Sequence, residues 1–437
     1  MRFLRRPKRL GLALAVMLAA SVATACSDDE NVIAPPPPPP SNGDVELSGT
    51  LASSTTLDAD ETYLIRGPFI VPDGLTLTIP PGTLLEGDVN TTGSALIVRQ
   101  GGRLVAQGTA DSPIVFTSSN PPGQRARGDW GGVVLNGRSL CNFPADQCIG
   151  EGNSGPYGGT VLDDDSGILS YVRIEYAGFE VSFGNELNAL TLNGVGRGTE
   201  LHHIQAHFGS DDGIEFFGGT VDLKYAIVTG ASDDSFDYST GWQGRGQFWI
   251  AQQDPDDADN GWEVDGNEED FDATPLTDPL IYNVTLIGKG AGGTPGESTR
   301  GILFRRGTAG DVYNVIIQGF EVGIDVDNAE TVDRVTLQNS IFFGNGVSFE
   351  EESPDDGIDE AAWTQQAAFN NRIGVDTGLA DPFNRAAPDF RPQAGSAALS
   401  GFATPPSDGF FDSVDFVGGV SPDGAPWYEG WITTELN

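Results

Sequence analysis

The chain has 437 residues, of which 59 are glycine, and its 63 acidic against 23 basic side chains give a formal net charge of −40. Such acidity argues against binding to nucleic acid or to anionic lipid, because both are themselves negatively charged. It is compatible with solubility outside the cell, with cation binding and with life in salt.

The first 25 residues are typical of a bacterial export signal. Basic residues precede the apolar run from Leu10 to Ala20, which is too short for a stable membrane span, and small residues follow it. Cys26 comes next and resembles the lipidated cysteine of a lipoprotein, although Ala23 stands where such signals usually carry leucine. We predict lipidation of Cys26, a membrane contact through that lipid, and a place at the outer membrane or cell surface. The alternative is an ordinary secretory signal with Cys26 unmodified.

Residues 26–44 are predicted to be a tether. They contain six consecutive prolines, Pro35 to Pro40, which favour a stiff polyproline II segment of about 3 Å per residue. A spacer of this kind would hold a single folded body, residues 45–437, away from a membrane surface.

The folded body begins with residues 45–88, which we interpret as an N-terminal cap and the first coils of a repetitive fold. Further along, Cys141 and Cys148 form a close pair on a predicted loop. In an exported protein the expected state of such a pair is a disulfide, which here would close only a local loop.

A repeat organises the middle of the chain. Carboxylate-rich turns begin at Asp211, Asp233 and Asp259, 22 and then 26 residues apart, and each is followed by a short strand with large apolar residues at alternate positions. Period-2 alternation places these apolar side chains on one face of the strands, which we take as the interior. The two columns are Leu190, Ile214, Phe236, Trp262, Ile302 and Ile324, and then Leu192, Phe216, Tyr238, Val264, Phe304 and Val326.

A second ladder has the form apolar-x-x-apolar-x-apolar. It begins at Leu169, Leu201, Leu223, Ile281, Val312 and Val332. The long gap before Ile281 leaves room for an extra coil, for which Phe248-Trp249-Ile250 is the candidate. Two strand columns per coil predict an all-β parallel β-helix, because each coil can bury its inward side chains only by stacking on its neighbours.

Several phrases resemble a known family. "LTIPPGTLLEG", "GRLVAQGTADSPIVFTS", "GDWGGVVLNGR" and "DDGIEFFGGTV" are similar to bacterial exported surface lipoproteins of the pectin-lyase-like superfamily. The resemblance runs from about Val45 to the C-terminus and implies a right-handed parallel β-helix. It leaves the activity open.

Two segments interrupt or end the pattern. Residues 350–371 are predicted to contain one short helix, inserted in the coil or lying across it. Residues 400–437 are predicted to cap the last coil with Trp427, Tyr428 and Trp431, because exposed strand edges invite association. Carbohydrate stacking by these rings is the lesser alternative.

The outward positions of the repeat carry the candidate metal ligands. Stacked coils lie about 4.8 Å apart, so carboxylates at equivalent positions repel unless something compensates. Oxygen-rich clusters suit Ca²⁺, and we predict such a site. The alternative is that the acidic side chains cap turns, accept backbone hydrogen bonds or keep their protons. The predicted ligands are Asp211, Asp212, Asp233, Asp234, Glu215, Asp237, Asp259 and Glu263.

An enzyme would use the same columns. The resemblance to polysaccharide lyases implies an arginine base beside calcium-binding carboxylates, and Arg305 between Asp265 and Asp327 is the candidate. Hydrolysis would instead need two suitably spaced carboxylates, which Asp211, Asp233 and Glu215 could supply. Ladders of acid and arginine on a solvated face are, however, commonly ion pairs of little energetic weight.

We favour a non-catalytic surface binding or structural protein, stabilised by Ca²⁺ and contacting glycans or neighbouring copies. Trp242 is a candidate platform for a sugar ring if it is exposed. A polysaccharide lyase or glycoside hydrolase acting on acidic polysaccharide is the first alternative. A self-assembling filament or adhesin is the second.

Overall fold

The computed structural model describes residues 45–182, 185–350 and 357–436. The predicted signal sequence, the lipidation at Cys26 and the tether therefore lie outside the described residues. Among the helices that are described, none combines the length and the apolar character that crossing a membrane requires.

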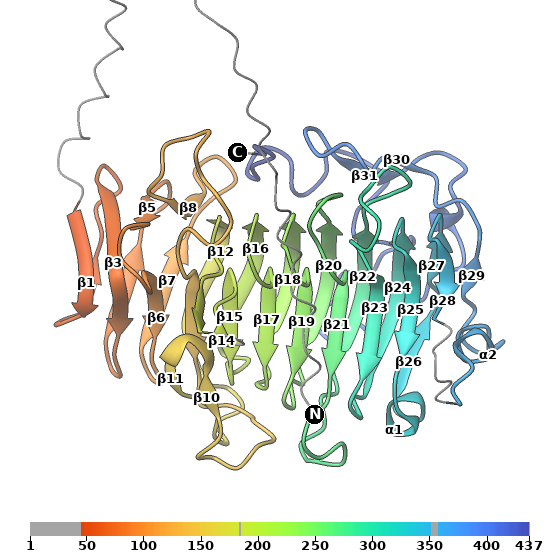
Figure 1. The fold of residues 1–437 in the computed structure, drawn as a ribbon, viewed down its shortest axis with the longest axis horizontal. Coiled ribbons are helices and arrows are strands. Elements are labelled where there is room, and N and C mark those ends of the chain that lie inside the picture. The colour runs from red at the N-terminus through yellow and green to blue at the C-terminus, as the bar shows by residue number, and fades with distance from the viewer. Residues whose placement is uncertain (1–44, 183–184, 351–356, 437) are drawn as a thin grey trace, which may run out of the picture. The chain divides into compact units, whose positions relative to one another are not determined.

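The described chain winds into a right-handed parallel β-helix with three faces, which confirms the predicted fold class (Figure 1). Face 1 consists of β2 (Thr55–Thr56), β4 (Thr76–Ile79), β7 (Arg103–Gln107), the N-terminal halves of β12 (Gly167–Glu175), β16 (Glu200–His207), β18 (Asp222–Thr229), β20 (Arg245–Gln252), β22 (Leu280–Ile287) and β24 (Gly310–Gln318), and β26 (Val335–Gln338). Face 2 consists of β1 (Val45–Thr50), the first half of β3 (Thr62–Val71), β5 (Leu84–Gly87), β8 (Ile114–Ser118), the C-terminal halves of the six long strands, β27 (Ile341–Phe343) and β29 (Arg372–Ile373).

Face 3 carries the predicted repeat. It consists of the second half of β3, then β6 (Ala95–Val98), β9 (Val133–Asn136), β15 (Leu190–Asn193), β17 (Ile214–Phe217), β19 (Phe236–Ser239), β21 (Trp262–Asp265), β23 (Arg300–Arg305), β25 (Val322–Val326) and β28 (Val347–Phe349). Outside the three faces lie the hairpins β10 (Ile149–Gly150) with β11 (Gly155–Pro156), β13 (Glu180–Ser182) with β14 (Asn185–Glu186), and β30 (Leu379–Asp381) with β31 (Asp389–Pro392). The short helices are η1 (Glu151–Asn153), α1 (Ala329–Val332), α2 (Glu360–Thr364) and η2 (Ala397–Leu399).

The predicted inward columns form the core. Every side chain named in the two face 3 columns is fully buried. The predicted extra coil is also present, because Trp249 of β20 lies in register between Ala226 and Val284. The Trp249 ring fills the space over Gly246, where the ladder pattern lacks a large side chain.

Two predictions about individual residues are wrong. Trp242 is fully buried, stacks on Phe216 at 4.3 Å and donates its indole N–H to the Val221 carbonyl, so no sugar can stack on it. The last ladder match is misplaced, because Val312 pairs with Leu337 while Val332 ends α1. The true match in this coil begins at Leu337, and the apolar pattern missed it because a serine occupies its second apolar position.

The long strands bend where faces 1 and 2 meet. At that bend one residue per coil has a positive φ, a left-handed conformation that few side chains other than glycine and asparagine adopt readily. The last three of these residues are asparagine, and the first four carry rings that stack on one another at centroid distances of 4.2, 4.5 and 5.0 Å. The residues are Tyr171, His203, Tyr225, Phe248, Asn283, Asn314 and Asn339.

The C-terminal end of the core is closed by α2. A helix in segment 350–371 was predicted, and α2 forms there, although residues 351–356 lie outside the described part. The Asp359 side chain accepts a hydrogen bond from the Ala362 N–H and caps the helix. Trp363 and Phe369 then join the main core cluster, so this segment, rather than the chain terminus, covers the inward side chains of the last coil.

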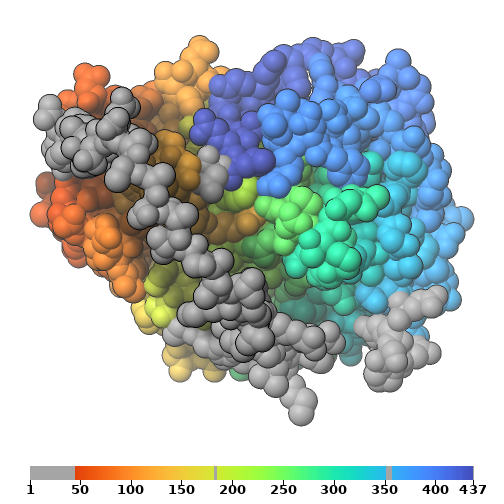
Figure 2. Space-filling model, turned by 45° about the horizontal axis from the view of Figure 1, so that its top comes forward, coloured from red at the N-terminus to blue at the C-terminus, as the bar shows by residue number. Residues whose placement is uncertain are grey.

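Residues 400–436 form what we call the strap, and the prediction that they cap the last coil is wrong. The strap runs back along the outside of the coils, and the end of the chain lies near β16 and β18 (Figures 1 and 2). Trp431 packs with Ile227 and Ile250 of the middle coils. The strap takes this path because outward amide side chains bind its backbone, as when Gln205 both donates to and accepts from Thr433.

Candidate metal centre

The acidic turns join face 2 to face 3. In successive coils one side chain at this corner accepts a hydrogen bond from the backbone of the next coil. Asn188 accepts from the Asp212 N–H at 3.2 Å, Asp212 from the Asp234 N–H at 3.0 Å, and Asp234 from the Asn260 N–H at 2.7 Å. The turn-capping alternative is therefore correct for one oxygen of Asp212 and one of Asp234.

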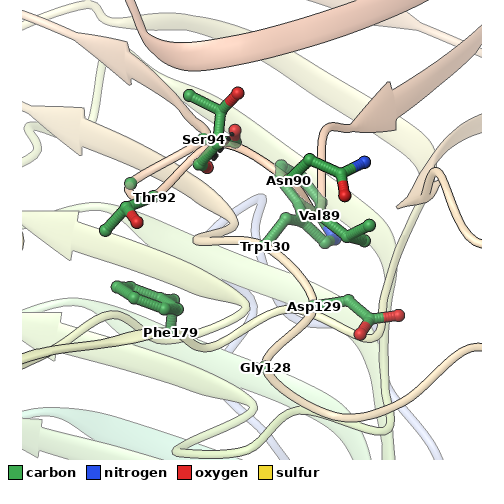
Figure 3. Close-up of a pocket in the computed structure, with 10 residues that line it drawn as sticks. Val89, Asn90, Thr92, Ser94, Gly128, Asp129, Trp130 and Phe179 are labelled. Atoms are coloured by element: carbon green, nitrogen blue, oxygen red, sulfur yellow. Dashed lines mark hydrogen bonds between the residues drawn. The ribbon is translucent and has the colours of Figure 1, made fainter.

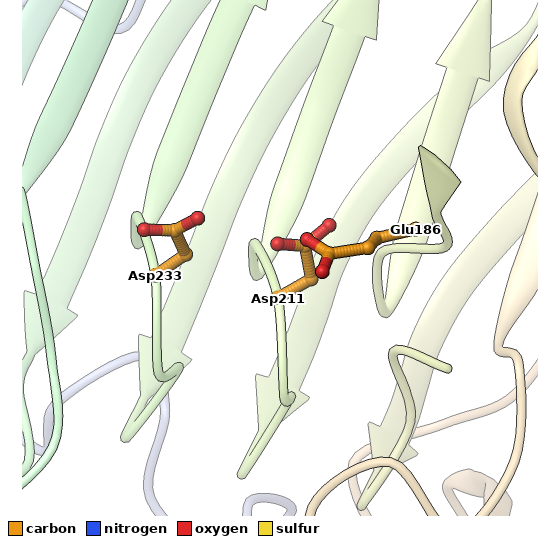
Figure 4. Close-up of side chains that lie close together, drawn as sticks. All are labelled: Glu186, Asp211 and Asp233. Atoms are coloured by element: carbon orange, nitrogen blue, oxygen red, sulfur yellow. The ribbon is translucent and has the colours of Figure 1, made fainter. Parts of the chain in front are cut away.

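The predicted carboxylates meet in four overlapping triads. In each triad one oxygen from every residue lies within 4.8 Å of the others. The first triad is Glu186, Asp211 and Asp233, and its side chains converge from β14 and two successive turns (Figure 4). The others are Asp212, Glu215 and Asp237; Asp233, Asp234 and Asp259; and Asp234, Asp237 and Glu263. We call these nine residues the acidic ladder.

Glu186 is the member that sequence reasoning missed. It belongs to the antiparallel hairpin β13–β14, which is inserted between coils and has no counterpart in the repeat. No periodic signal could have found it, since only folding brings this hairpin beside the turn at Asp211.

The outward side of face 3 is nearly buried in this region. Glu215 and Asp237 are only 7% and 9% exposed. The loop between β9 and β12 covers the neighbouring column, because Asn136 donates to the Ser154 carbonyl and Asn193 donates to the Asn136 side chain. The predicted disulfide between Cys141 and Cys148 is present at the start of this loop.

Burial and mutual repulsion change the acidity of the ladder. Loss of water, followed by the charges of neighbouring carboxylates, raises the pKa of Asp212, Glu215, Asp234 and Asp237 well above the ordinary values. The same two causes raise the pKa of Glu263 to about 8, although Arg305 opposes the shift. The raised pKa values mean that the fold disfavours the ionised form of these carboxyl groups, and a bound cation would offset that cost.

One atom of the ladder points specifically to a missing partner. The Oδ1 atom of Asp237 is buried and has no hydrogen-bond partner among the described residues, and the same is true of the Ser235 hydroxyl. Asp237 belongs to two of the four triads, as do Asp233 and Asp234. A buried carboxylate oxygen without a donor is costly, and a bound cation would satisfy it.

Arginines contact the C-terminal end of the ladder. Arg305 donates from Nε to Asp265 at 2.7 Å and contacts Glu263, while Arg306 also pairs with Asp265. One coil further on, Arg300 pairs with Asp325. Burial raises the pKa of the Asp325 carboxyl to about 6.

The predicted catalytic residues do not form one group. Arg305 pairs with Asp265, whereas Asp327 is partly exposed, follows β25 and is in no ion pair with Arg305 among the described residues. Burial alone would lower the pKa of Arg305, but Asp265 and Glu263 outweigh burial and raise it above the ordinary value. A base must release its proton readily, so this environment opposes that role.

The candidate hydrolytic carboxylates are divided as well. Asp211 and Asp233 share a triad, whereas Glu215 belongs with Asp212 and Asp237. Asp211 and Glu215 are each only 7% exposed, which hinders the approach of a sugar ring to both groups.

Comparison with known proteins agrees with this architecture. The model of the family described as "Pectate-lyase like beta helix domain" matches residues 49–382. The chain belongs to this pectate-lyase-like β-helix family. Among solved structures, the crystal structure of pectate lyase Pel9A is similar at 12% identity and a TM-score of 0.35, over 83% of this chain and 88% of that one. No curated protein matches the chain. Family membership relates the protein to polysaccharides in general terms and specifies neither binding nor catalysis.

Proposed function

We propose that the protein is a non-catalytic binding or structural protein of the cell surface, whose β-helix is stabilised by Ca²⁺ in the acidic ladder and which contacts glycans. The observation that carries the metal assignment is the buried, unpartnered Oδ1 of Asp237 between two carboxylate triads. Carboxylates supply only oxygen ligands, and Ca²⁺ accepts six to eight oxygens in flexible geometry, partly from water.

A binding role fits the burial of the ladder better than catalysis does. A small cation can be enclosed by nearly buried carboxylates, whereas a polysaccharide needs an open groove to reach reacting groups. Arg305, whose pKa is raised chiefly by Asp265, is suited to fixing the strands of neighbouring coils and poorly suited to abstracting a proton. The glycan contact rests on family membership alone.

Thermal melting of the purified protein in Ca²⁺ and in EDTA tests the metal site. A ligand that binds only the native state stabilises it by about 2.7 kcal/mol at a free concentration 100 times its Kd. We expect millimolar Ca²⁺ to raise Tm and expect Asp237→Asn to abolish most of that rise. The matched control is Asp60→Asn, an exposed acid far from the ladder, which should keep the full response. An identical Tm in Ca²⁺ and EDTA would leave the ladder as a set of protonated turn-formers and remove the metal from the proposal.

A separate assay distinguishes binding from catalysis. The protein is incubated with pectate and with other acidic polysaccharides, and both retention in affinity electrophoresis and formation of unsaturated uronate ends are followed. Retention without product supports the binding role. Product formation that disappears in Arg305→Lys would replace the proposal with the lyase alternative.

The surface location is part of the same proposal. It rests on the basic and apolar N-terminal segment, the following Cys26 and the proline tether. Metabolic labelling with a palmitate analogue should mark the wild type and not Cys26→Ser. Equal labelling of the wild type and the variant would contradict the lipid anchor and favour ordinary secretion.

A further inference from the structure

The outward column of face 3 changes character along the helix. In the middle coils it carries Glu215, Asp237 and Glu263, whereas in the first coils the same register carries Ile70, Ile97 and Val134. These apolar side chains point away from the main core and form a separate small cluster with Leu187. The first coils therefore present an apolar strip where the later coils present carboxylates.

A cavity of about 310 Å³ lies on this strip. Its floor is formed by Ile70 and Ile97, and the hairpin β13–β14 with the residues beside it supplies Phe179, Val181 and Leu187 as a wall. Phe179 also borders a second, more polar cavity of about 170 Å³, opposite Asn90 and Asp129 (Figure 3). The larger cavity is at the lower end of the size range of small-molecule sites, which spans roughly 300–1,000 Å³.

One charged side chain, Arg99, lines the apolar cavity. Its guanidinium lies against the backbone of Gly155, where an added Cβ would be 2.8 Å from Nη1. The Nε atom is buried without a hydrogen-bond partner, and Arg99 takes part in none of the ion pairs among the described residues. Arg197 and Arg372 also take part in none of these ion pairs, but of the three only Arg99 lines this cavity, so a ligand bound there could supply the missing partner.

We propose that this cavity binds a free fatty acid of medium chain length, with the alkyl chain over the apolar strip and the carboxylate on Arg99. A mainly apolar wall with one cation matches a ligand that is apolar along its length and anionic at one end. Saccharides fit less well, because their hydroxyl groups need many hydrogen-bond partners and the walls at Ile70, Ile97, Val181 and Leu187 offer none. The volume accommodates one alkyl chain and excludes a two-chain lipid.

Isothermal titration calorimetry of the full protein tests the proposal with decanoate, kept below its micelle concentration, and with decanol. We expect decanoate to bind the wild type and decanol to bind at least tenfold more weakly. Arg99→Gln should weaken decanoate binding at least tenfold, and Phe179→Ala should weaken it severalfold because the apolar wall is shortened.

Arg103→Gln is the matched control, since Arg103 begins β7, the next strand in the chain, pairs with partly exposed Asp165 and stands outside the cavity. It should bind decanoate as the wild type does, and unchanged melting of every variant shows that the fold is retained. Equal binding of decanoate and decanol, or full binding by Arg99→Gln, would overturn the assignment. So would binding of an acidic oligosaccharide to this cavity in place of decanoate.

Discussion

Replacing Glu263 with glutamine should stabilise the metal-free protein at alkaline pH and leave it unchanged at acidic pH. The fold raises the pKa of this carboxyl from its ordinary 4.5 to about 8. Below the ordinary value the group is protonated in both the folded and the unfolded state, and stability is unaffected. As pH rises from there through about 8, the unfolded chain ionises while the folded chain resists, so stability is lost over that window.

The size of the effect follows from the shift. One pKa unit corresponds to about 1.4 kcal/mol, so ionised Glu263 costs the fold roughly 5 kcal/mol in the absence of a cation. Unfolding entropy is about 2.1 cal/mol/K per residue, which gives about 0.8 kcal/mol/K for a folded body of roughly 390 residues. The wild type should therefore lose about 6 °C in Tm relative to Glu263→Gln between about pH 5 and about pH 9.

Differential scanning fluorimetry in EDTA across this pH range measures the difference. Glu268→Gln is the control, because Glu268 is exposed on a nearby turn and its substitution should leave the pH profile of the wild type unchanged. Arg305 keeps its pair with Asp265 in the Glu263→Gln protein, so the ion-pair network at the end of the ladder persists. Parallel pH profiles for wild type and Glu263→Gln would refute the reasoning that burial holds a proton on this carboxyl.

Three further predictions concern the parts that enclose the fold. Replacing Cys141 and Cys148 with serine opens a short loop and should lower stability by about 2–3 kcal/mol, seen as a lower Tm that added reductant no longer changes. Trp363→Ala removes the aromatic side chain that closes the core end and should cost about 3–5 kcal/mol in denaturant unfolding, whereas a small effect would mean that α2 is not a cap. Gln247→Ala removes two hydrogen bonds to the strap backbone at Asp412, of 2.9 and 2.8 Å, and should make the strap several times more sensitive to limited proteolysis with little change in Tm.

Only the repeating part of the candidate site could be predicted from the sequence. The acidic residues of the turns recur with the coil, so their approach across successive coils was predictable from the register. The place of Glu186 in the ladder was not predictable, because Glu186 belongs to an inserted hairpin. The covering of the neighbouring column at Asn136 and Asn193 was not either, because the loop between β9 and β12 carries no periodic signal.

The sequence by itself determined the coil, its inward columns and its disulfide. The coil and its columns depend on contacts between equivalent positions of neighbouring repeats, and a periodic pattern of apolar residues is a direct record of such contacts. The disulfide joins two cysteines that are close in the sequence. Only the tertiary structure decided where the non-repeating segments lie. Trp242 folds into the core, the strap returns over the middle coils through amides such as Gln205, and the apolar strip at Ile97 meets Arg99 under a hairpin. Each of these placements results from long-range packing between segments that differ in sequence, so no local pattern could record it.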